Sequence, residues 1–407
     1  MPGPLSHIRV LDLSRVLAGP WAAQNLADLG AEVIKIERPG AGDDTRGWGP
    51  PWLKDGAGKD TKESAYFTSV NRNKKSVTLD ISKPDGQAIV RELASKCQVL
   101  IENYKVGTLK RYGLGYEDLK SGNPSLIYCS VTGFGQDGPF APLPGYDFIF
   151  QGMGGLMSIT GERDGQPGAG PQKVGIAITD VLTGMYASVA ILAAITYRER
   201  TGQGQYIDTA LLDTIVAFNA NQIVSYFASG KVPVRWGNAH PQVVPYEVFP
   251  TADGHIILAI GNDGQFERFC EVADAKALVE EARFKTMSQR IVHRAELIPL
   301  IAEIMRTRTK AEWIEALEAA TVPCGPINNM KEVFENPQVR HRKLRVDIPH
   351  PAGGSAPVVR SPLRLSETPV DYRLAPPLLG QHNDDVLRGL LGKSEAEVQR
   401  LKAAGIV

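Results

Sequence analysis

The sequence has no excess of charge of either sign. Its 407 residues contain 45 Lys plus Arg and 45 Asp plus Glu, so the formal net charge is zero. No overall field therefore favours nucleic acid or an anionic membrane surface, and an anionic ligand has to be held by locally placed cations. We expect neither a nucleic-acid nor a membrane partner.

Cysteine is scarce, and its four residues are widely spaced: Cys97, Cys129, Cys270 and Cys324. This spacing contains no C-x-x-C pair, which argues against a structural zinc site or a disulfide framework and suits a reducing compartment. The seven histidines are also far apart in the sequence, so we expect no metal.

Targeting and membrane-spanning segments are also lacking. The first four residues contain no basic region followed by an apolar run, so no secretory signal is expected. The longest apolar stretch, residues 185–195, is interrupted by Ser188 and is too short to span a bilayer. We expect a cytoplasmic protein.

Several catalytic signatures are absent: the G-x-S-x-G elbow, the phosphate-binding Walker loop and the H-E-x-x-H metal pair. Residues 152–155 (GMGG) do not match the dinucleotide pattern G-x-G-x-x-G, and no acidic residue stands where a ribose partner belongs.

Strand-like and helix-like segments alternate through the first half of the chain. This alternation predicts an α/β fold with a parallel sheet and helices on both faces. The expected strands are 8–13, 32–36, 76–79, 99–102, 126–131 and 206–211, with helices at 21–29, 84–94 and 181–198. Because ligands bind outside the carboxyl ends of such strands, the loops 14–20, 37–40 and 103–105 are expected to wall the site.

The composition changes near residue 230. A Pro-rich passage leads to an expected strand at 256–260 and amphipathic helices at 295–305 and 310–320. We therefore predict three stretches: a large domain over 1–225, a smaller one over 226–325, and a segment 326–407 that returns to the large domain. The loop 261–265 is interpreted as a strand-to-helix turn, with a mobile flap as the alternative.

The segment 173–184 (KVGIAITDVLTG) places Asp180 between an apolar run and a long helix. The free N–H groups and the positive end of the helix dipole stabilise a carboxylate at such a boundary. Spacing alone therefore favours Asp180 as an ordinary N-cap, and a nucleophilic role needs further evidence.

Several motifs in order resemble the family III coenzyme A transferases. They include the Asp180 segment, residues 12–20 (DLSRVLAGP), 35–40 (KIERPG), 71–76 (NRNKKS), 102–104 (ENY), 145–147 (GYD), 201–205 (TGQGQ) and 376–380 (PPLLG). The resemblance runs nearly end to end. It implies a Rossmann-like large domain, an inserted smaller α+β domain and an interlocked homodimer, with an acyl-CoA and a carboxylic acid as substrates and no bound cofactor.

In that family the Asp matching Asp180 is the nucleophile. It attacks the donor thioester to give a mixed anhydride, and the CoA thiolate then forms an aspartyl-CoA thioester. A carboxylate nucleophile preserves the energy of the thioester, which water would dissipate.

The resemblance also implies ligand contacts. Arg38 resembles a contact to the adenine-nucleotide end of CoA, and Lys74 and Arg111 resemble phosphate contacts, with a solvated surface charge as the alternative for each. Residues at strand-end loops are expected to hold the pantetheine, with turn chemistry as the alternative: Asn71, Asn103 and Tyr104. Arg15 is expected to face a CoA phosphate or a substrate carboxylate, with a salt-bridge partner as the alternative. Leu17 and Ala18, in the same loop, are also expected to contact the CoA or the substrate.

Two positions separate the activities within the family. The racemases carry His where Tyr146 stands, and a tyrosine pKa near ~10 suits acid-base work at neutral pH poorly. The oxalate enzymes carry Gln where Leu17 stands, together with a glycine-rich insertion that the stretch 237–246 lacks.

The motifs therefore resemble most the succinyl-CoA-dependent dicarboxylate branch, with glutarate as the expected acceptor. His240 or another cation is expected to pair with the distal carboxylate of the acceptor, and a satisfied loop histidine is the alternative. A 2-methylacyl-CoA racemase and a non-catalytic acyl-CoA-binding protein are the rival interpretations.

Overall fold

The computed structural model describes residues 2–407 and divides into two compact units. The large unit comprises Met1–Leu156, Val174–Ser229 and Arg340–Val407, and the small unit comprises Met157–Lys173 and Gly230–Val339. The predicted large domain, 1–225, therefore differs from the large unit because it included residues 157–173. The predicted returning segment, 326–407, begins earlier than the third stretch of the large unit.

Hydrogen bonds explain why residues 157–173 belong to the small unit. The Gly237 N–H donates to the Gly161 carbonyl at 3.1 Å, and Arg163 Nε donates to the Trp236 carbonyl at 3.1 Å. Arg163 also lies 3.6 Å from the Glu247 carboxylate. These partners are more than 70 residues away in the chain, so local composition does not reveal them.

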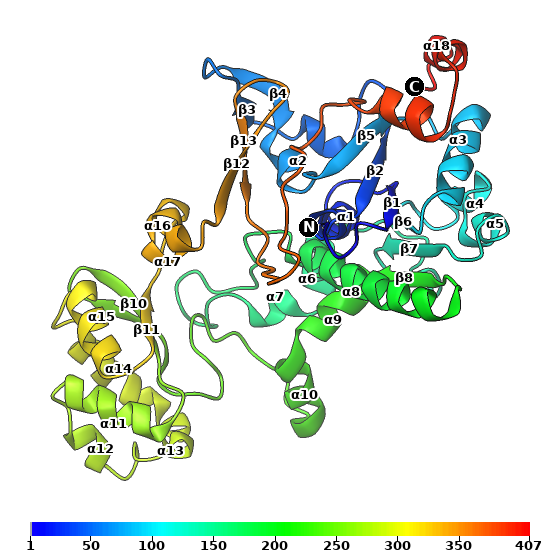
Figure 1. The fold of residues 1–407 in the computed structure, drawn as a ribbon. Coiled ribbons are helices and arrows are strands. Elements are labelled where there is room, and N and C mark those ends of the chain that lie inside the picture. Colours follow the sequence, from blue (N-terminus) through cyan, green and yellow to red (C-terminus); the bar gives the residue numbers. More distant parts are fainter. Residues whose placement is uncertain (1) are drawn as a thin grey trace. The chain divides into compact units, whose positions relative to one another are not determined.

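Within residues 2–407, six parallel strands form the sheet of the large unit, which confirms the predicted α/β fold with a parallel sheet (Figure 1). Their order is β5-β2-β1-β6-β7-β8. From β1 the chain adds β2 and β5 on one side and then β6, β7 and β8 on the other, so the switch point lies between β1 and β6. Ligands of doubly wound sheets bind at this switch point. The strands are β1 (Arg9–Asp12), β2 (Glu32–Glu37), β5 (Lys74–Thr78), β6 (Val99–Glu102), β7 (Ile127–Thr132) and β8 (Tyr206–Ala210).

Helices and two hairpins complete the large unit. The helices are α1 (Ala18–Asp28), α2 (Ala65–Ser69), α3 (Pro84–Ser95), α4 (Thr108–Arg111), α5 (Tyr116–Lys120), α6 (Asp147–Met153), α8 (Ile178–Thr201), α9 (Leu211–Phe218), α10 (Ala220–Ser229) and α18 (Glu395–Ala403). The short η1 (Asp44–Gly47) and the π-helix η2 (Asp385–Leu390) join them. The hairpins are β3 (Trp52–Lys54) with β4 (Asp60–Ser64), and β12 (Arg345–Pro349) with β13 (Ser355–Val359).

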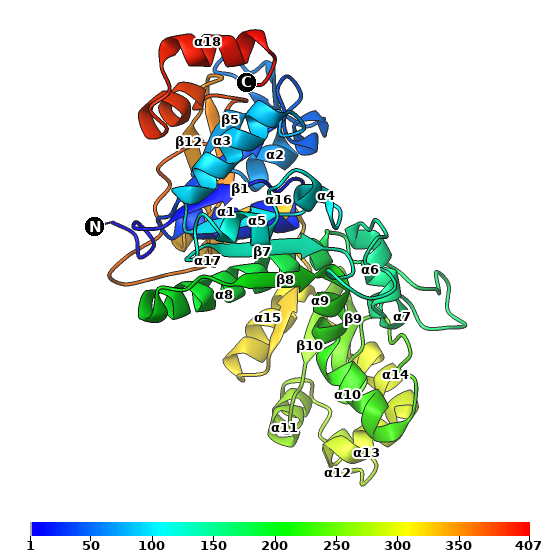
Figure 2. The same ribbon diagram turned by 90° about the vertical axis from the view of Figure 1, so that its right-hand side faces the viewer.

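The C-terminal helix α18 lies beside α3, where both views place it (Figures 1 and 2). Arg400 of α18 forms an ion pair of 2.7 Å with Asp85 of α3. Val398 and Leu401 join the apolar core that also contains Leu93 and Leu100. The C-terminal segment thus returns to cover the sheet of the large unit.

Helix α8 starts three residues earlier than predicted and is 24 residues long. By length and apolar composition alone this helix would be able to cross a membrane, because it extends beyond the apolar stretch 185–195 at both ends. In the structure α8 packs against α1 and the strands β7 and β8. Gly184 permits the close approach to α1, because a Cβ at this position would lie 2.5 Å from the Ala18 carbonyl oxygen.

The small unit has an antiparallel sheet of three strands among its described residues, in the order β11-β10-β9. Trp313 is fully buried in its core, and its indole N–H donates to the Met305 carbonyl at 2.7 Å. The strands are β9 (Tyr246–Thr251), β10 (Gly254–Ala259) and β11 (Cys324–Pro326); the helices are α11 (Asp263–Val272), α12 (Ala277–Glu280), α13 (Met287–Val292), α14 (Arg294–Met305), α15 (Lys310–Ala319) and α16 (Met330–Glu335). Helices α7 (Leu156–Ile159) and α17 (Pro337–His341) each contain a point in the sequence at which the chain passes from one unit to the other.

The loop 261–265 connects β10 to α11 as a strand-to-helix turn. The cap of α11 is Asn262, whose side chain accepts from the Gln265 N–H at 2.9 Å. Asp263 instead pairs with the buried Arg290 at 2.8 Å.

A buried ion pair anchors the C-terminal segment to the large unit. Arg72 pairs with Asp28 at 2.5 Å and donates to the Val359 carbonyl at 3.1 Å. Asn73 donates to Asp28 at 2.9 Å and to the Asp371 carbonyl at 2.8 Å. The polar stretch 71–74 therefore joins three distant parts of the chain.

We predict that Arg72→Ala lowers the free energy of unfolding by ~3–5 kcal/mol, because it leaves the Asp28 carboxylate buried without its charge partner. Urea unfolding followed by circular dichroism measures the change. The control is Arg345→Ala, which removes an exposed ion pair with Asp347 and is expected to cost at most ~1 kcal/mol. Equal costs for the two variants would contradict the anchoring role of Arg72.

Candidate active site

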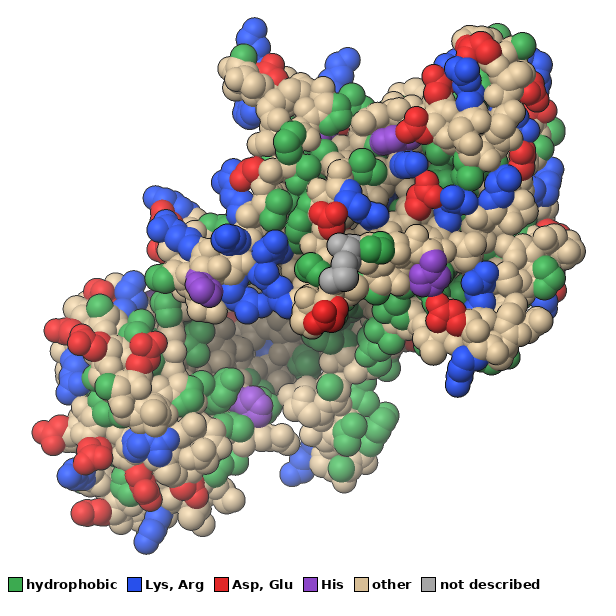
Figure 3. Space-filling view, viewed as in Figure 1, with side chains coloured by type: hydrophobic (Ala, Val, Ile, Leu, Met, Phe, Trp, Pro, Cys, Tyr) green, Lys and Arg blue, Asp and Glu red, His purple; other side chains and the backbone are tan. Residues whose placement is uncertain are grey.

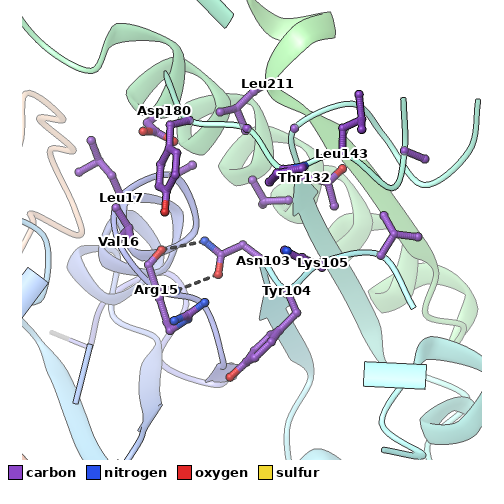
Figure 4. A pocket seen from close by; sticks show the side chains of 18 of the residues that line it. Arg15, Val16, Leu17, Asn103, Tyr104, Lys105, Thr132, Leu143, Asp180 and Leu211 are labelled. Carbon is purple, nitrogen blue, oxygen red and sulfur yellow. Dashed lines mark hydrogen bonds between the residues drawn. The ribbon is translucent and has the colours of Figure 1, made fainter. Parts of the chain in front are cut away.

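A cavity of about 220 Å³ opens at the switch point of the sheet (Figure 4). Its walls come from the loops after β1, β6 and β7 and from the first turn of α8, all within the large unit. The residues that line it include Arg15, Val16, Leu17, Ala18, Asp44, Asn103, Tyr104, Lys105, Thr132, Leu143, Tyr146, Asp180 and Leu211. Six of the residues predicted from the sequence therefore lie around one cavity with Asp180: Arg15, Leu17, Ala18, Asn103, Tyr104 and Tyr146.

Asp180 is the third residue of α8 and lines this cavity. Its carboxylate accepts no hydrogen bond from any other residue between 2 and 407 and is half-buried. The position before the helix is occupied by Ala177, which has no capping side chain. The capping interpretation of Asp180 was therefore wrong, and its carboxylate is left free for chemistry.

Burial, reinforced by the negative charge of Asp147, raises the pKa of Asp180 to about 7. Both causes disfavour the charged form of the carboxyl group. An uncharged side chain escapes both effects, so the surroundings of Asp180 favour an uncharged form over a free carboxylate.

The cap of α8 comes from Asp147, the first residue of α6. Its Oδ1 accepts from the N–H of Thr179 at 2.7 Å and lies 3.4 Å from the N–H of Asp180. Sequence reasoning noted the motif Gly145-Tyr146-Asp147 but gave Asp147 no role. The only available signal was an acidic residue in that motif, because the capped N–H groups lie 32 and 33 residues away.

The loop after β1 is held by the side chain of Asn103. The Asn103 Oδ1 accepts from the Arg15 N–H at 2.9 Å, and its Nδ2 donates to the Arg15 carbonyl at 2.7 Å, as the dashed lines in Figure 4 mark. Arg15 pairs with Asp44 at 2.8 Å, and its guanidinium lies 5.5 Å from the ring centre of Tyr104. Asn103 thus shapes the cavity wall through the main chain of Arg15.

Buried charges support the same loop from below. Val16 has φ of +68°, which is strained for a β-branched residue, and its N–H lies 3.3 Å from both oxygens of Asp43. Lys35 pairs with Asp43 at 2.9 Å. Burial alone would lower the pKa of Lys35, but the charges of Asp43 and Asp12 outweigh it and raise that pKa to about 12. The pair therefore remains charged and fixes the strained turn.

A second cavity of about 340 Å³ lies beside the first in the large unit. Arg15 and Tyr104 line both cavities, and the exposed Arg38 lines the second. The second cavity is bounded by the end of β2 and the loop after β5, through Glu37 and Ser82. This location, next to the switch point, matches the expected position of Arg38 at a ligand-binding edge of the sheet.

Lys74 does not occupy the position predicted for a phosphate contact. It is fully buried, and its ammonium group contacts Asp12 at 3.0 Å, the Pro20 carbonyl at 2.9 Å and Asn71 at 3.0 Å. Strand β5 begins at Lys74 instead of Ser76. These two residues lie two positions apart on the strand, so both side chains point to the same, buried face. Burial lowers the pKa of Lys74 to about 8 despite the nearby Asp12.

Asn71 is likewise buried away from the cavities. Its Nδ2 donates to the Phe67 carbonyl at 2.8 Å, while its Oδ1 accepts from Lys74. The prediction that Asn71 contacts pantetheine therefore disagrees with its position, and the alternative of local turn chemistry fits it.

Three further predicted residues remain to be placed. Arg111 is exposed at the end of α4, and its guanidinium lies 3.4 Å from the Thr108 hydroxyl. Tyr146 is 70% exposed and lines the cavity with Asp180. His240 belongs to the small unit, where its ring accepts from the Gln242 N–H at 3.0 Å, so the alternative of a satisfied loop histidine fits this contact.

Sequence reasoning placed Lys105 in the wall loop 103–105 without giving it a role of its own, and it missed Tyr66. Lys105 lines the Asp180 cavity as an exposed cation without an ion-pair partner among residues 2–407. Burial, reinforced by the negative charges of Asp180 and Asp147, raises the pKa of the Tyr66 hydroxyl on α2. Lys105 lies next to the predicted Tyr104, whereas no sequence signal indicates Tyr66.

No group of three or more His, Cys, Asp or Glu side chains among residues 2–407 is arranged to hold a metal ion. The fold and the site instead define an α/β protein whose ligand crevice lies at the switch point and carries a single free carboxylate on a helix start. The chain matches the model of CoA-transferase family III over residues 5–383 and belongs to that family.

Two curated relatives and one solved structure resemble the chain over nearly its whole length. A succinate–glutarate CoA-transferase of Agrobacterium fabrum is 49% identical over 387 residues, which are 95% of this chain and 96% of that protein. The succinyl-CoA:glutarate CoA-transferase of Homo sapiens is 44% identical over 404 residues, 99% of this chain and 90% of that protein. A CaiB/BaiF family protein from Brucella suis has a TM-score of 0.84 at 44% identity, covering 96% of this chain and 100% of that one.

We predict that Asp180→Asn stabilises the fold at high pH. The folded pKa of Asp180 is raised to about 7 from 3.8, so the folded state is favoured while the group is protonated and loses that advantage as the pH rises through 7. At pH 8 the free energy of unfolding of the variant should be ~1–2 kcal/mol higher than that of the wild type. The effect is no larger because the side chain is only half-buried and solvent screens its charge.

Thermal unfolding at pH 8 and pH 4 measures this difference, which should vanish at the lower pH. Asp371→Asn, at an exposed carboxylate, is the control for the change in net charge. A variant less stable than the wild type at pH 8 would contradict the assignment of an unfavourable charge to Asp180.

Proposed function

We propose that this chain transfers coenzyme A from succinyl-CoA to glutarate, with Asp180 as the nucleophile. The observation that carries the proposal is the Asp180 carboxylate on the wall of the switch-point cavity, which accepts no hydrogen bond from residues 2–407. Its family is CoA-transferase family III, and the relatives at 49% and 44% identity are transferases named for succinate or succinyl-CoA and glutarate.

The proposed reaction runs through four acyl transfers. The Asp180 carboxylate attacks the thioester carbonyl of succinyl-CoA, which forms a mixed anhydride and releases the CoA thiolate. The thiolate attacks the Asp180 carbonyl of the anhydride, which forms an aspartyl-CoA thioester and releases succinate. Glutarate then attacks this thioester, which forms a second anhydride and releases the CoA thiolate again. This thiolate attacks the glutaryl carbonyl of the anhydride. Glutaryl-CoA leaves and the Asp180 carboxylate is restored.

The two adjacent cavities suit the two ends of an acyl-CoA. The cavity of about 340 Å³ takes the nucleotide end, with the Arg38 guanidinium available to an anionic or adenine group. Tyr104 and Arg15 line both cavities, so the pantetheine passes along them towards Asp180. Arg111, exposed on α4, remains a candidate for a CoA phosphate.

A diacid acceptor needs a cation for the carboxylate that does not react. Arg15 is already paired with Asp44, whereas Lys105 has no such partner among residues 2–407 and lines the cavity. We assign Lys105 to this contact, with His240 as the other candidate. A buried or partly buried carboxylate bound to a cation contributes both affinity and orientation.

Water has to be kept from the anhydride and thioester, since hydrolysis would end the transfer. The cavity walls are apolar over much of their extent: Val16, Leu17, Val131, Pro142, Leu143, Pro144 and Leu211. Leu17 therefore acts in the proposed mechanism as part of an apolar wall beside the reacting groups. Tyr146 lines the same cavity with a neutral phenol and no basic imidazole.

The proposed assembly is an interlocked homodimer. Helix α10 has no buried residue, although six of its ten side chains are apolar, and Figure 3 shows apolar side chains gathered over it. Contiguous apolar surface of this extent marks an interface. The large exposed apolar side chains of α6, α8, α9 and α10 are Phe148, Ile149, Met153, Met185, Tyr186, Val189, Tyr197, Val216, Phe218, Val224, Tyr226 and Phe227.

We predict that incubation with succinyl-CoA and glutarate yields glutaryl-CoA and succinate. Mass spectrometry of the CoA esters measures this conversion. Asp180→Ala should lower the rate by at least ~10³-fold, because no other residue replaces the acyl acceptor. Retention of CoA binding by the variant, measured by calorimetry, is the control for its fold. Near wild-type turnover by Asp180→Ala, or no transfer to any diacid, would contradict the proposal.

For the assembly, we expect sedimentation equilibrium to give twice the mass of one chain at micromolar concentration. An interface covering so many apolar side chains buries enough area for stable association. A monomer under these conditions would contradict the proposed dimer.

A further inference from the structure

The start of helix α8 depends on a carboxylate from a different helix. Asp147 is buried at the first position of α6, and its Oδ1 accepts from the Thr179 N–H at 2.7 Å. The same oxygen lies 3.4 Å from the Asp180 N–H. The first N–H groups of a helix have no partner within the helix, so Asp147 supplies what Ala177 cannot.

Gln151, one turn further along α6, fixes the orientation of Asp147. This glutamine is fully buried, and its Nε2 donates to Asp147 Oδ2 at 2.6 Å and to the Ile176 carbonyl at 3.2 Å. Its Oε1 accepts from the Val174 N–H at 2.8 Å. The amide thereby ties both the capping carboxylate and the segment that leads into α8 to one rigid helix.

The arrangement has two consequences for Asp180. Because Asp147 takes the capping position, the Asp180 carboxylate is not needed by the backbone and stays in the cavity. A second negative charge also lies next to it and opposes its ionisation. Acylation of Asp180 removes one of the two charges, whereas hydrolysis restores it.

Other charged and titratable groups surround this pair. The charges of both carboxylates act on the hydroxyl of Tyr66 on α2, and the other charged or titratable groups that line the Asp180 cavity are Arg15, Asp44, Tyr104, Lys105 and Tyr146. Arg15 is compensated by Asp44 at 2.8 Å. Asp147 is the carboxylate whose charge acts on Asp180, so its removal should have a specific effect.

We propose that Asp147, oriented by Gln151, is the positioning residue of the transfer: it fixes the first turn of α8 and its charge favours the uncharged acyl form of Asp180. This inference rests on the proposed function, in which Asp180 is the nucleophile. Asp147 does not touch the substrate in this scheme and acts only through Asp180 and the backbone that carries it.

Two substitutions separate the two actions of Asp147. Asp147→Asn keeps an oxygen acceptor for the Thr179 N–H and removes the charge, whereas Asp147→Ala removes both. In Asp147→Asn we expect the acid limb of kcat/KM, near pH 7 in the wild type because of the Asp180 pKa, to move to lower pH, while the larger contribution of burial remains. The fraction of enzyme held as the aspartyl-CoA thioester at equilibrium should fall about tenfold.

Asp147→Ala is expected to show the same shift of the acid limb and a further loss of kcat of about tenfold, because the first turn of α8 is no longer held. Gln151→Leu should lower kcat without moving the acid limb as far, since Asp147 keeps its charge but loses its orientation. Intact-protein mass spectrometry after incubation with succinyl-CoA measures the thioester fraction, and the pH profile is measured with glutarate as the acceptor.

The matched control is Ser394→Ala, which removes the N-cap of α18 at the C-terminal end of the chain. It should cost stability and leave kcat and the acid limb unchanged. A wild-type acid limb together with a wild-type thioester fraction in Asp147→Asn would overturn the inference while leaving the proposed function intact. A wild-type enzyme that makes no glutaryl-CoA would instead contradict the proposed function itself.

Discussion

The hydrogen bond between Asp147 and the first turn of α8 is the interaction on which the account of the site depends. A helix start needs an acceptor, and in this chain that acceptor comes from α6. Asp180 is consequently released from the role that its position in the sequence suggests. The same bond brings two carboxylates together, which is unfavourable for the fold and would favour the acylated form of Asp180 in the proposed reaction.

The large unit surrounds this pair with fixed structure. The switch between β1 and β6 brings the loops after these strands to one edge of the sheet, and Asn103 binds the main chain of Arg15 across the switch. Buried charges below the loop hold the strained Val16 in place. The proposed reaction through anhydrides needs such order, because its reacting groups have to meet repeatedly while water is kept out.

Much of the fold follows from patterns that act over short distances. The six strands were expected within about two residues of their observed limits, since alternation of apolar runs with helical spacing encodes the parallel sheet. Small errors in the predicted boundaries of strands and helices changed the roles predicted for site residues. Strand β5 begins at Lys74, which turns an expected phosphate ligand into a buried partner of Asp12, and α8 begins before Asp180. The partners that decide both cases, Asp12 and Asp147, are 62 and 33 residues away and leave no local signal.

The central claim is that Asp180 forms the covalent intermediates of the transfer. The most direct measurement is the mass of the peptide that contains Asp180. The enzyme is incubated with succinyl-CoA without acceptor, quenched, digested and analysed by tandem mass spectrometry, with and without hydroxylamine. The account predicts a CoA adduct on Asp180 that hydroxylamine converts to a hydroxamate at the same residue. An unmodified Asp180 under turnover conditions, or an adduct on another residue, would contradict it.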